Sequence, residues 1–222
     1  MCFSAPGSIV TGTVLAASGL YAIEQAKDRD KSFLMFASIP FFFGIQQLIE
    51  GVVWIAFGKD QAMVAMASQA YVFFAFAFWP FFSPLAVYFA EKPANVFLKR
   101  LLWLLILVGL VIGLLAYFPI LLGSVRLIVQ VVHHSISYDT DRPEILKRVY
   151  LSLYLLSVIV PFLVVRDLKM KVFGVLLIFS VLMSYLFFSY AFDSVWCLFA
   201  AVLSLYIIYI MRTLPAAKAA LK

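Results

Sequence analysis

The chain has 222 residues, of which 65% are hydrophobic and only 13% are charged. A soluble domain is closer to half apolar and a quarter charged, so the composition excludes an ordinary soluble domain and indicates a polytopic membrane protein. The formal net charge is +6, but basic residues of such proteins gather in cytoplasmic loops, so the lipid bilayer is the expected partner and nucleic acid is not.

The hydrophobic segments predict a seven-transmembrane-helix bundle. A helix needs roughly 20 apolar residues to cross the hydrocarbon core. The expected helices cover residues of about 6–25, 33–57, 62–90, 99–122, 148–165, 171–191 and 194–212. We therefore expect one integral, all-α membrane domain over residues 1–222. The third segment is overlong and contains Pro80 and Pro84, which predicts a kink or a re-entrant bend there.

Basic residues predict the orientation of the bundle. Three of them lie in each of the first, third and fifth loops and in the C-terminal tail, which makes twelve of the 17 in the chain. The positive-inside rule then places the N-terminus outside and the C-terminus in the cytoplasm. We expect a multi-pass protein of the cell (inner or plasma) membrane. A homo-oligomer is compatible with the sequence.

The longest predicted loop, at about residues 123–147, lies outside between the fourth and fifth helices. Its segment 126–138, RLIVQVVHHSISY, is β-branched and partly alternating, which predicts a strand or a short hairpin over the outer mouth of the bundle. The following segment Asp139–Pro143 has turn residues. Glu144 is expected to open the fifth helix.

The second predicted helix carries a polar stripe. Gln46, Glu50 and Trp54 follow one another at four-residue intervals, with Gln47 beside them, so they share one helix face. A carboxylate at membrane depth costs several kcal/mol unless it is paired, protonated or hydrated, and it is a functional-site hypothesis by default.

The predicted topology brings further polar residues to the outer part of the bundle. We expect a polar pocket there that binds a small ligand or a metal ion, as in a sensor or receptor. The predicted ligand-binding residues are Gln46, Gln47, Glu50, Trp54, Gln69, Tyr190 and Trp196. The structural alternative is that Glu50 and the glutamines only form interhelical hydrogen bonds, with Gln69 as the partner of Glu50.

Two other functions remain open. Cys2, Glu50, His134 and Cys197 offer oxygen, nitrogen and sulfur donors that suit zinc or copper, although no pair of them has a diagnostic metal-site spacing, and the two cysteines could instead form a disulfide. An intramembrane enzyme would use Glu50 as general base with His134 or Cys2. A transporter of a small solute or ion would use Glu50 for coupling. A retinal protein is not expected, because the segment 194–212 contains no lysine.

The opening residues Met1–Ala5, MCFSA, are similar to the start of an uncharacterised family of bacterial multi-pass membrane proteins. The blocks GIQQ…EG…W at residues 44–54 and SVWC at residues 194–197 resemble further signatures of that family. The resemblance covers the whole chain and implies no established activity. It implies that a family constellation is formed by Cys2, Gln46, Gln47, Glu50, Trp196 and Cys197.

Overall fold

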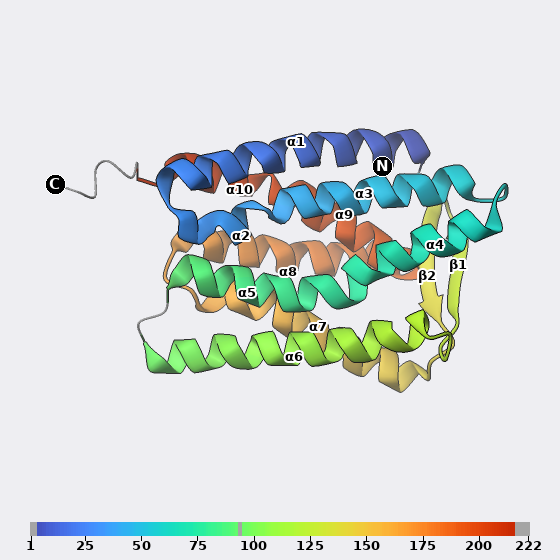
Figure 1. Cartoon of the computed structure of the whole chain (residues 1–222). Helices are drawn as coiled ribbons and strands as arrows, with labels where there is room; N and C mark the ends of the chain where they lie inside the picture. The colour runs from blue at the N-terminus through green and yellow to red at the C-terminus, as the bar shows by residue number, and fades with distance from the viewer. Residues whose placement is uncertain (1–3, 93–94, 216–222) are drawn as a thin grey trace.

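The structure, a computed structural model, describes residues 4–92 and 95–215. The helices lie side by side along one long direction, and a small two-stranded sheet crosses one end (Figure 1). Six helical segments in the described residues are long and apolar enough to cross a membrane. They are Ala5–Arg29, Lys31–Ala56, Gln61–Glu91, Val96–Leu121, Glu144–Val164 and Leu168–Thr213. The predicted, mainly helical fold is therefore confirmed, and the six long apolar segments support the predicted multi-pass membrane protein.

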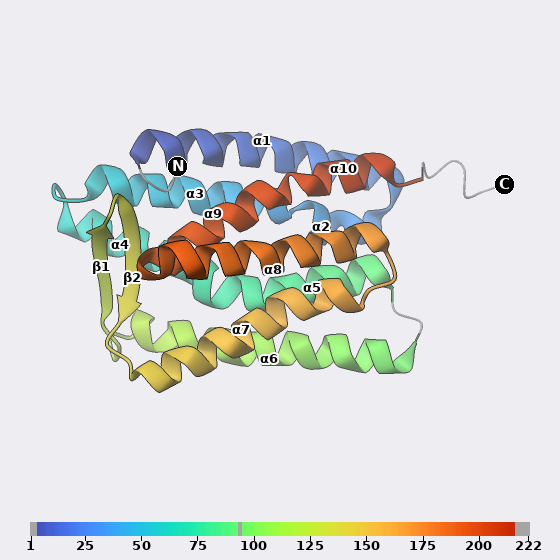
Figure 2. The ribbon, with the colours of Figure 1, turned by 180° about the vertical axis from the view of Figure 1, so that it is seen from behind.

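The last of these segments contains two antiparallel limbs. Helix α8 (Leu168–Phe188) ends in the 3-10 turn η3 (Ser189–Ala191), and α9 (Phe192–Ser204) and α10 (Tyr206–Thr213) follow. The chain reverses at η3, so that α9 and α10 run back along the bundle (Figure 2). The predicted helices at 171–191 and 194–212 correspond to these two limbs. Together they have 46 residues, far more than one crossing needs.

The first half of the chain forms α1 (Ala5–Arg29), η1 (Lys31–Phe33), α2 (Leu34–Ala37), α3 (Ile39–Ala56), α4 (Gln61–Val72), the π-helical turn η2 (Phe73–Phe78) and α5 (Trp79–Glu91). Helices α1 and α3 pack closely through glycines. A Cβ atom on Gly19 would lie 2.2 Å from the backbone nitrogen of Phe41, and one on Gly44 would lie 2.5 Å from that of Ala16. Small residues at these positions therefore allow the two backbones to touch.

The prolines of the third segment bend the helix without interrupting it. Pro80 has no N–H to donate to the carbonyl of Phe76, and its ring would clash with that carbonyl in a regular α-helix. The π-helical turn η2 precedes Pro80 and widens the backbone at this point. The segment Gln61–Glu91 stays helical throughout, and α4 and α5 meet at a bend (Figure 1). A kink is found here, and no re-entrant loop.

Helices α6 (Val96–Leu121) and α7 (Glu144–Val164) are joined by an antiparallel hairpin of β1 (Leu127–Val132) and β2 (Ser135–Thr140). The predicted β-like element between these helices is therefore confirmed. Its turn, however, is formed by His133 and His134, while Asp139 belongs to β2. The expected turn at Asp139–Pro143 is thus displaced, because the apolar alternation continues through the buried side chains of Ile136 and Tyr138.

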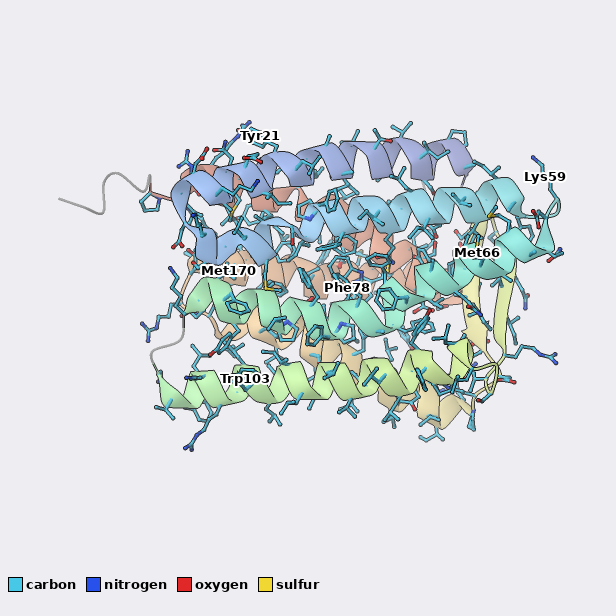
Figure 3. The ribbon with its side chains drawn as sticks, viewed as in Figure 1. Tyr21, Lys59, Met66, Phe78, Trp103 and Met170 are labelled. Atoms are coloured by element: carbon cyan, nitrogen blue, oxygen red, sulfur yellow. The ribbon has the colours of Figure 1, made fainter. Side chains whose placement is uncertain are left out.

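The loops that were predicted to be cytoplasmic meet at the end opposite the hairpin. Asp30 accepts hydrogen bonds from the backbone and hydroxyl of Ser32, at 2.9 and 2.7 Å, and pairs with Lys92 at 3.0 Å. Arg166 lies 3.6 Å from Glu91. Burial acts to raise the pKa of Asp30, but the hydrogen bonds of Ser32 and the contact with Lys92 hold it below its ordinary value. Lys59 marks the hairpin end, and Phe78 lies at mid-length of the bundle (Figure 3).

Candidate functional site: a cavity beneath the hairpin

A cavity of about 440 Å³ lies at the hairpin end of the bundle. Its walls come from η2, α6, α7, α8, η3 and α9, and β2 lies across it. Aromatic rings form much of this wall. The aromatic lining residues are Phe76, Tyr138, Tyr150, Tyr154, Tyr185, Tyr190, Phe192 and Trp196. The volume and the mixed apolar and polar lining are typical of a small-molecule site.

Ring contacts fix the hairpin to the helices. Tyr138 of β2 is buried and stacks on Tyr71 of α4, with the ring centroids 4.4 Å apart and the planes at 15°. At the turn, His133 meets Tyr190 of η3 edge-on, with the centroids 5.1 Å apart. The hairpin therefore contacts the bundle through its second strand and through its turn, and the cavity lies beneath it.

The charged residues of the cavity are mostly paired. Lys147 lies 2.6 Å from Asp139, and Glu144 lies 3.5 Å from Arg148. The guanidinium of Arg142 donates to the carbonyl of Leu115 at 3.0 Å and lies over a tyrosine ring of the cavity wall. Each of these lining charges thus has a partner of its own.

Asp193 differs from the other charged lining residues. It lies in the first turn of α9 and lines the cavity. In the described part of the chain, no lysine, arginine or histidine nitrogen lies within 4.0 Å of its carboxylate. The charges that act on it are those of Asp139 and Lys147, which oppose one another. Its carboxylate therefore has no ion-pair partner of its own among the described residues.

The predicted polar stripe lies inside the bundle, behind the cavity wall. Gln46, Gln47 and Glu50 have no exposed surface. The Ser194 hydroxyl donates to Oε1 of Glu50 at 2.5 Å, and the indole N–H of Trp79 donates to Oε1 of Gln46 at 2.7 Å. The stripe thus connects α3 to α5 and α9 through hydrogen bonds.

Cys197 joins this network to the cavity. Its side chain lines the cavity and has polar contacts with Tyr71 and Gln46. The neighbouring Trp196 also lines the cavity, and its indole N–H donates to the hydroxyl of Ser180 at 3.1 Å. Ser194 and Cys197, one helical turn apart on α9, therefore face the glutamate and the glutamine of α3.

Comparison with known proteins gives the family. A family model described as a family of unknown function, DUF6629, matches residues 1–222. The chain belongs to the DUF6629 family. The expected membership of an uncharacterised family is thereby confirmed. No curated protein and no solved structure matches the chain.

The structure of this DUF6629 member brings some of the predicted site residues together and separates others. Of the seven predicted ligand-binding residues, only Tyr190 and Trp196 line the cavity. Gln69 is partly buried on α4, and Trp54 packs against the apolar cluster around Tyr71. The predicted Glu50–Gln69 pair is replaced by Glu50–Ser194.

Two of the proposed metal ligands within the described residues, His134 and Glu50, lie in different environments. His134 is exposed at the hairpin turn, whereas Glu50 is wholly buried. Among residues 4–92 and 95–215, no three histidine, cysteine, aspartate or glutamate side chains are close enough to hold a metal ion. Cys2, and with it the alternative of a disulfide to Cys197, lies outside the described residues.

Sequence reasoning missed the face of α7 that lines the cavity. Lys147, Tyr150, Leu151 and Tyr154 all line it and follow the i, i+3, i+4, i+7 spacing of a single helix face. That spacing is readable in the sequence, but a carboxylate at membrane depth is a stronger signal for a site, and it indicates the stripe on α3. Asp193 lies three residues after Tyr190 and also lines the cavity, but it is not among the predicted site residues.

Proposed function

We propose that this DUF6629 member is a sensor-like or receptor-like membrane protein that binds a small ligand in the cavity beneath the hairpin. The observation that carries the proposal is the cavity itself, about 440 Å³ with an aromatic wall and with one carboxylate, Asp193, that forms no ion pair with the described residues. Small-molecule sites commonly have 300–1,000 Å³ and a few polar groups in an otherwise apolar wall. Tyr190 and Trp196 would contact the ligand directly.

The proposal places the cavity on the outer side of the cell membrane. We take α8 and the α9–α10 limb as separate crossings, which gives seven spans with the N-terminus outside. The support is the reversal of the chain at η3 and the contacts that join the basic loops at the opposite end, such as Lys92 with Asp30. The positive-inside rule assigns that end to the cytoplasm.

The buried stripe would act as the support of the cavity wall. Hydrogen bonds from Ser194 to Glu50 and from Trp79 to Gln46 hold α9 and α5 against α3. Side-chain hydrogen bonds between membrane helices contribute about 0.6 kcal/mol on average and up to about 1.7 kcal/mol. Two such bonds would contribute about 1–3 kcal/mol to holding this wall in position.

The alternatives have less support. An enzyme with Glu50 as general base and His134 as its partner needs both side chains at one reacting atom, whereas one is buried and the other exposed. A transporter needs a polar route beyond the cavity. The deeper cavity that shares Tyr154, Trp196 and Cys197 measures only about 20 Å³ and has a mostly apolar wall, room for about one water molecule.

Thiol labelling tests the orientation. In a background with Cys2→Ser and Cys197→Ala, Ser137→Cys reports on the cavity and Lys92→Cys on the opposite end. A membrane-impermeant maleimide added to intact cells should modify the first variant, and the second only after permeabilisation. The reverse order would refute the assignment of the cavity to the outer side.

A cavity-filling substitution tests ligand binding. Ala116→Trp places an indole in the cavity wall, whereas Val111→Trp adds one at a position of α6 that is 52% exposed. In a thermal-shift screen of small molecules, compounds that stabilise the unsubstituted protein and Val111→Trp should have no effect on Ala116→Trp. Compounds that stabilise all three proteins equally, or a screen without any stabilising compound, would contradict the proposal.

A further inference from the structure

We infer that the cavity beneath the hairpin takes a small organic ammonium ion, with the Asp193 carboxylate as its counter-ion and aromatic rings as its walls. The inference rests on the proposed function and adds the chemical class of the ligand. It follows from the charges that line the cavity, from the rings around them and from the position of Asp193 in α9.

Acidic residues outnumber basic residues among the charged residues that line the cavity, three to two. Lys147 is engaged by Asp139 at 2.6 Å, and Arg142 by a backbone carbonyl at 3.0 Å. Glu144 pairs with Arg148 at 3.5 Å. Within the described residues, Arg142 forms no ion pair either, and Asp193 is the lining carboxylate for which none forms. A ligand cation would give Asp193 the ion-pair partner that it lacks among the described residues, without displacing Lys147 or Arg148 from its own carboxylate.

The aromatic wall suits a cation as well. The faces of tyrosine and tryptophan rings attract a positive charge within about 6 Å of the ring centre. The cavity already contains one such contact, because the guanidinium carbon of Arg142 lies 5.1 Å from the centre of the Tyr150 ring. On the α9 side, Trp196 stacks with Phe192 at 5.8 Å and meets Tyr154 edge-on at 5.4 Å. Asp193 lies next to this aromatic group in sequence and lines the same cavity.

A helix N-terminus and a bound cation would both favour the ionised form of the Asp193 carboxylate. It lies in the first turn of α9, where the partial positive charge of the helix N-terminus favours a carboxylate. A helix terminus alone would not define a site. Here it is combined with a cavity, an aromatic wall and a carboxylate without an ion-pair partner, and together these features select a positively charged ligand with apolar substituents.

Four probes of similar size test the inference on the full chain in phosphatidylglycerol nanodiscs. They are benzylammonium, benzyltrimethylammonium, benzyl alcohol and benzoate, and binding is measured by calorimetry and by the fluorescence of the cavity tryptophan. At least one of the two cations should bind at least about tenfold more tightly than the neutral and the anionic probe. Equal binding of all four, or preference for benzoate, would overturn the inference.

Two substitutions complete the test. Asp193→Asn should weaken binding of the cation at least about tenfold, whereas the matched control Glu144→Gln, at a paired carboxylate of the same cavity, should change it less than about threefold. If a neutral or anionic probe binds and is lost in Ala116→Trp, the ligand class is wrong but the cavity still binds ligands. If no probe binds and the library screen also finds no ligand, the proposed function fails with it.

The ammonium group could belong to a free solute or to the headgroup of a lipid. Nanodiscs with added phosphatidylethanolamine or phosphatidylcholine separate these sources. Competition by such a lipid, seen as weaker binding of the soluble cation, supports the inference and identifies a headgroup. Unchanged binding supports it with a free solute as the ligand.

Discussion

The hydrogen bond between Ser194 and Glu50 should contribute measurably to the stability of the bundle. Both side chains have no exposed surface, and the oxygens are 2.5 Å apart. Loss of a donor to a buried oxygen costs about 1–3 kcal/mol, so Ser194→Ala should lower the free energy of unfolding by that amount. Because the bond is short and shielded from water, we expect a coupling energy near the upper measured value for membrane helices, about 1–1.7 kcal/mol.

A double-mutant cycle isolates this coupling. The four proteins are the unsubstituted chain, Ser194→Ala, Glu50→Leu and the double variant, unfolded reversibly in mixed micelles with increasing detergent denaturant and followed by circular dichroism. The effect of the cavity left by Glu50→Leu is common to both arms of the cycle and cancels. Costs that add to within about 0.5 kcal/mol would refute the structural role of the pair.

Ligand binding by a Glu50→Gln variant then shows whether Glu50 supports the cavity wall or contacts the ligand directly. This variant keeps a side-chain oxygen for Ser194 to donate to but removes the carboxylate. If the stripe supports the cavity wall, binding should change less than about threefold, whereas Asp193→Asn should lose at least about tenfold. Loss of binding in Glu50→Gln alone, with the helical content unchanged, would instead make Glu50 the anchor of the ligand.

Four further substitutions test the fold. Gly109→Ala should destabilise the bundle by about 1–3 kcal/mol or more, because its Cβ would lie 1.8 Å from the carbonyl oxygen of Pro80, and Gly113→Ala, with 2.9 Å to its nearest atom, should cost less; detergent denaturation measures both. His134→Gly should raise stability by about 1 kcal/mol, because His134 has φ of 61°; an unchanged melting temperature would contradict this. The pKa of Asp30 is lower in the folded protein, so its contribution is present above the unfolded value of about 3.9 and is lost as pH falls through the folded value. Asp30→Asn should therefore be less stable than the unsubstituted chain at pH 7, and the difference should shrink below about pH 4.

The sequence could predict the helices because each crossing needs a long apolar run. In the bilayer core, only helices and closed barrels satisfy all the hydrogen bonds of the backbone. It could also predict that Glu50, Gln46 and Gln47 lie inside the bundle. It could not identify their partners: Ser194 is 144 positions away from Glu50 and Trp79 is 33 positions away from Gln46. Such pairs depend on which helices become neighbours, and hydrophobic patterning does not specify that.

The hairpin shows a different limit of sequence reasoning. The sequence predicts a turn at Asp139–Pro143 and not at the two histidines. A two-residue hairpin turn with positive φ usually contains glycine or asparagine, and neither occurs at these two positions. The structure has φ of 46° and 61° at these histidines. The buried contact between Tyr138 and Tyr71 fixes the strand register, and tertiary packing thereby overrides the local turn preference.

The cost of burying a charge explains why we assign support of the cavity wall to Glu50 and ligand binding to Asp193. An ion held in a dry helix bundle loses its hydration, and it is tolerated only where bonds within the bundle replace water. Glu50 has no exposed surface and accepts a hydrogen bond from Ser194. A bond within the bundle therefore replaces a bond to water. A ligand-binding carboxylate must instead exchange water for ligand, which requires a cavity and a position near the membrane edge. Asp193 has both, since it begins α9 beside the reversal of the chain and lines the cavity. Cys197, one turn further along the same helix, touches the network of α3, so an occupied cavity would act on the helix whose position that network fixes.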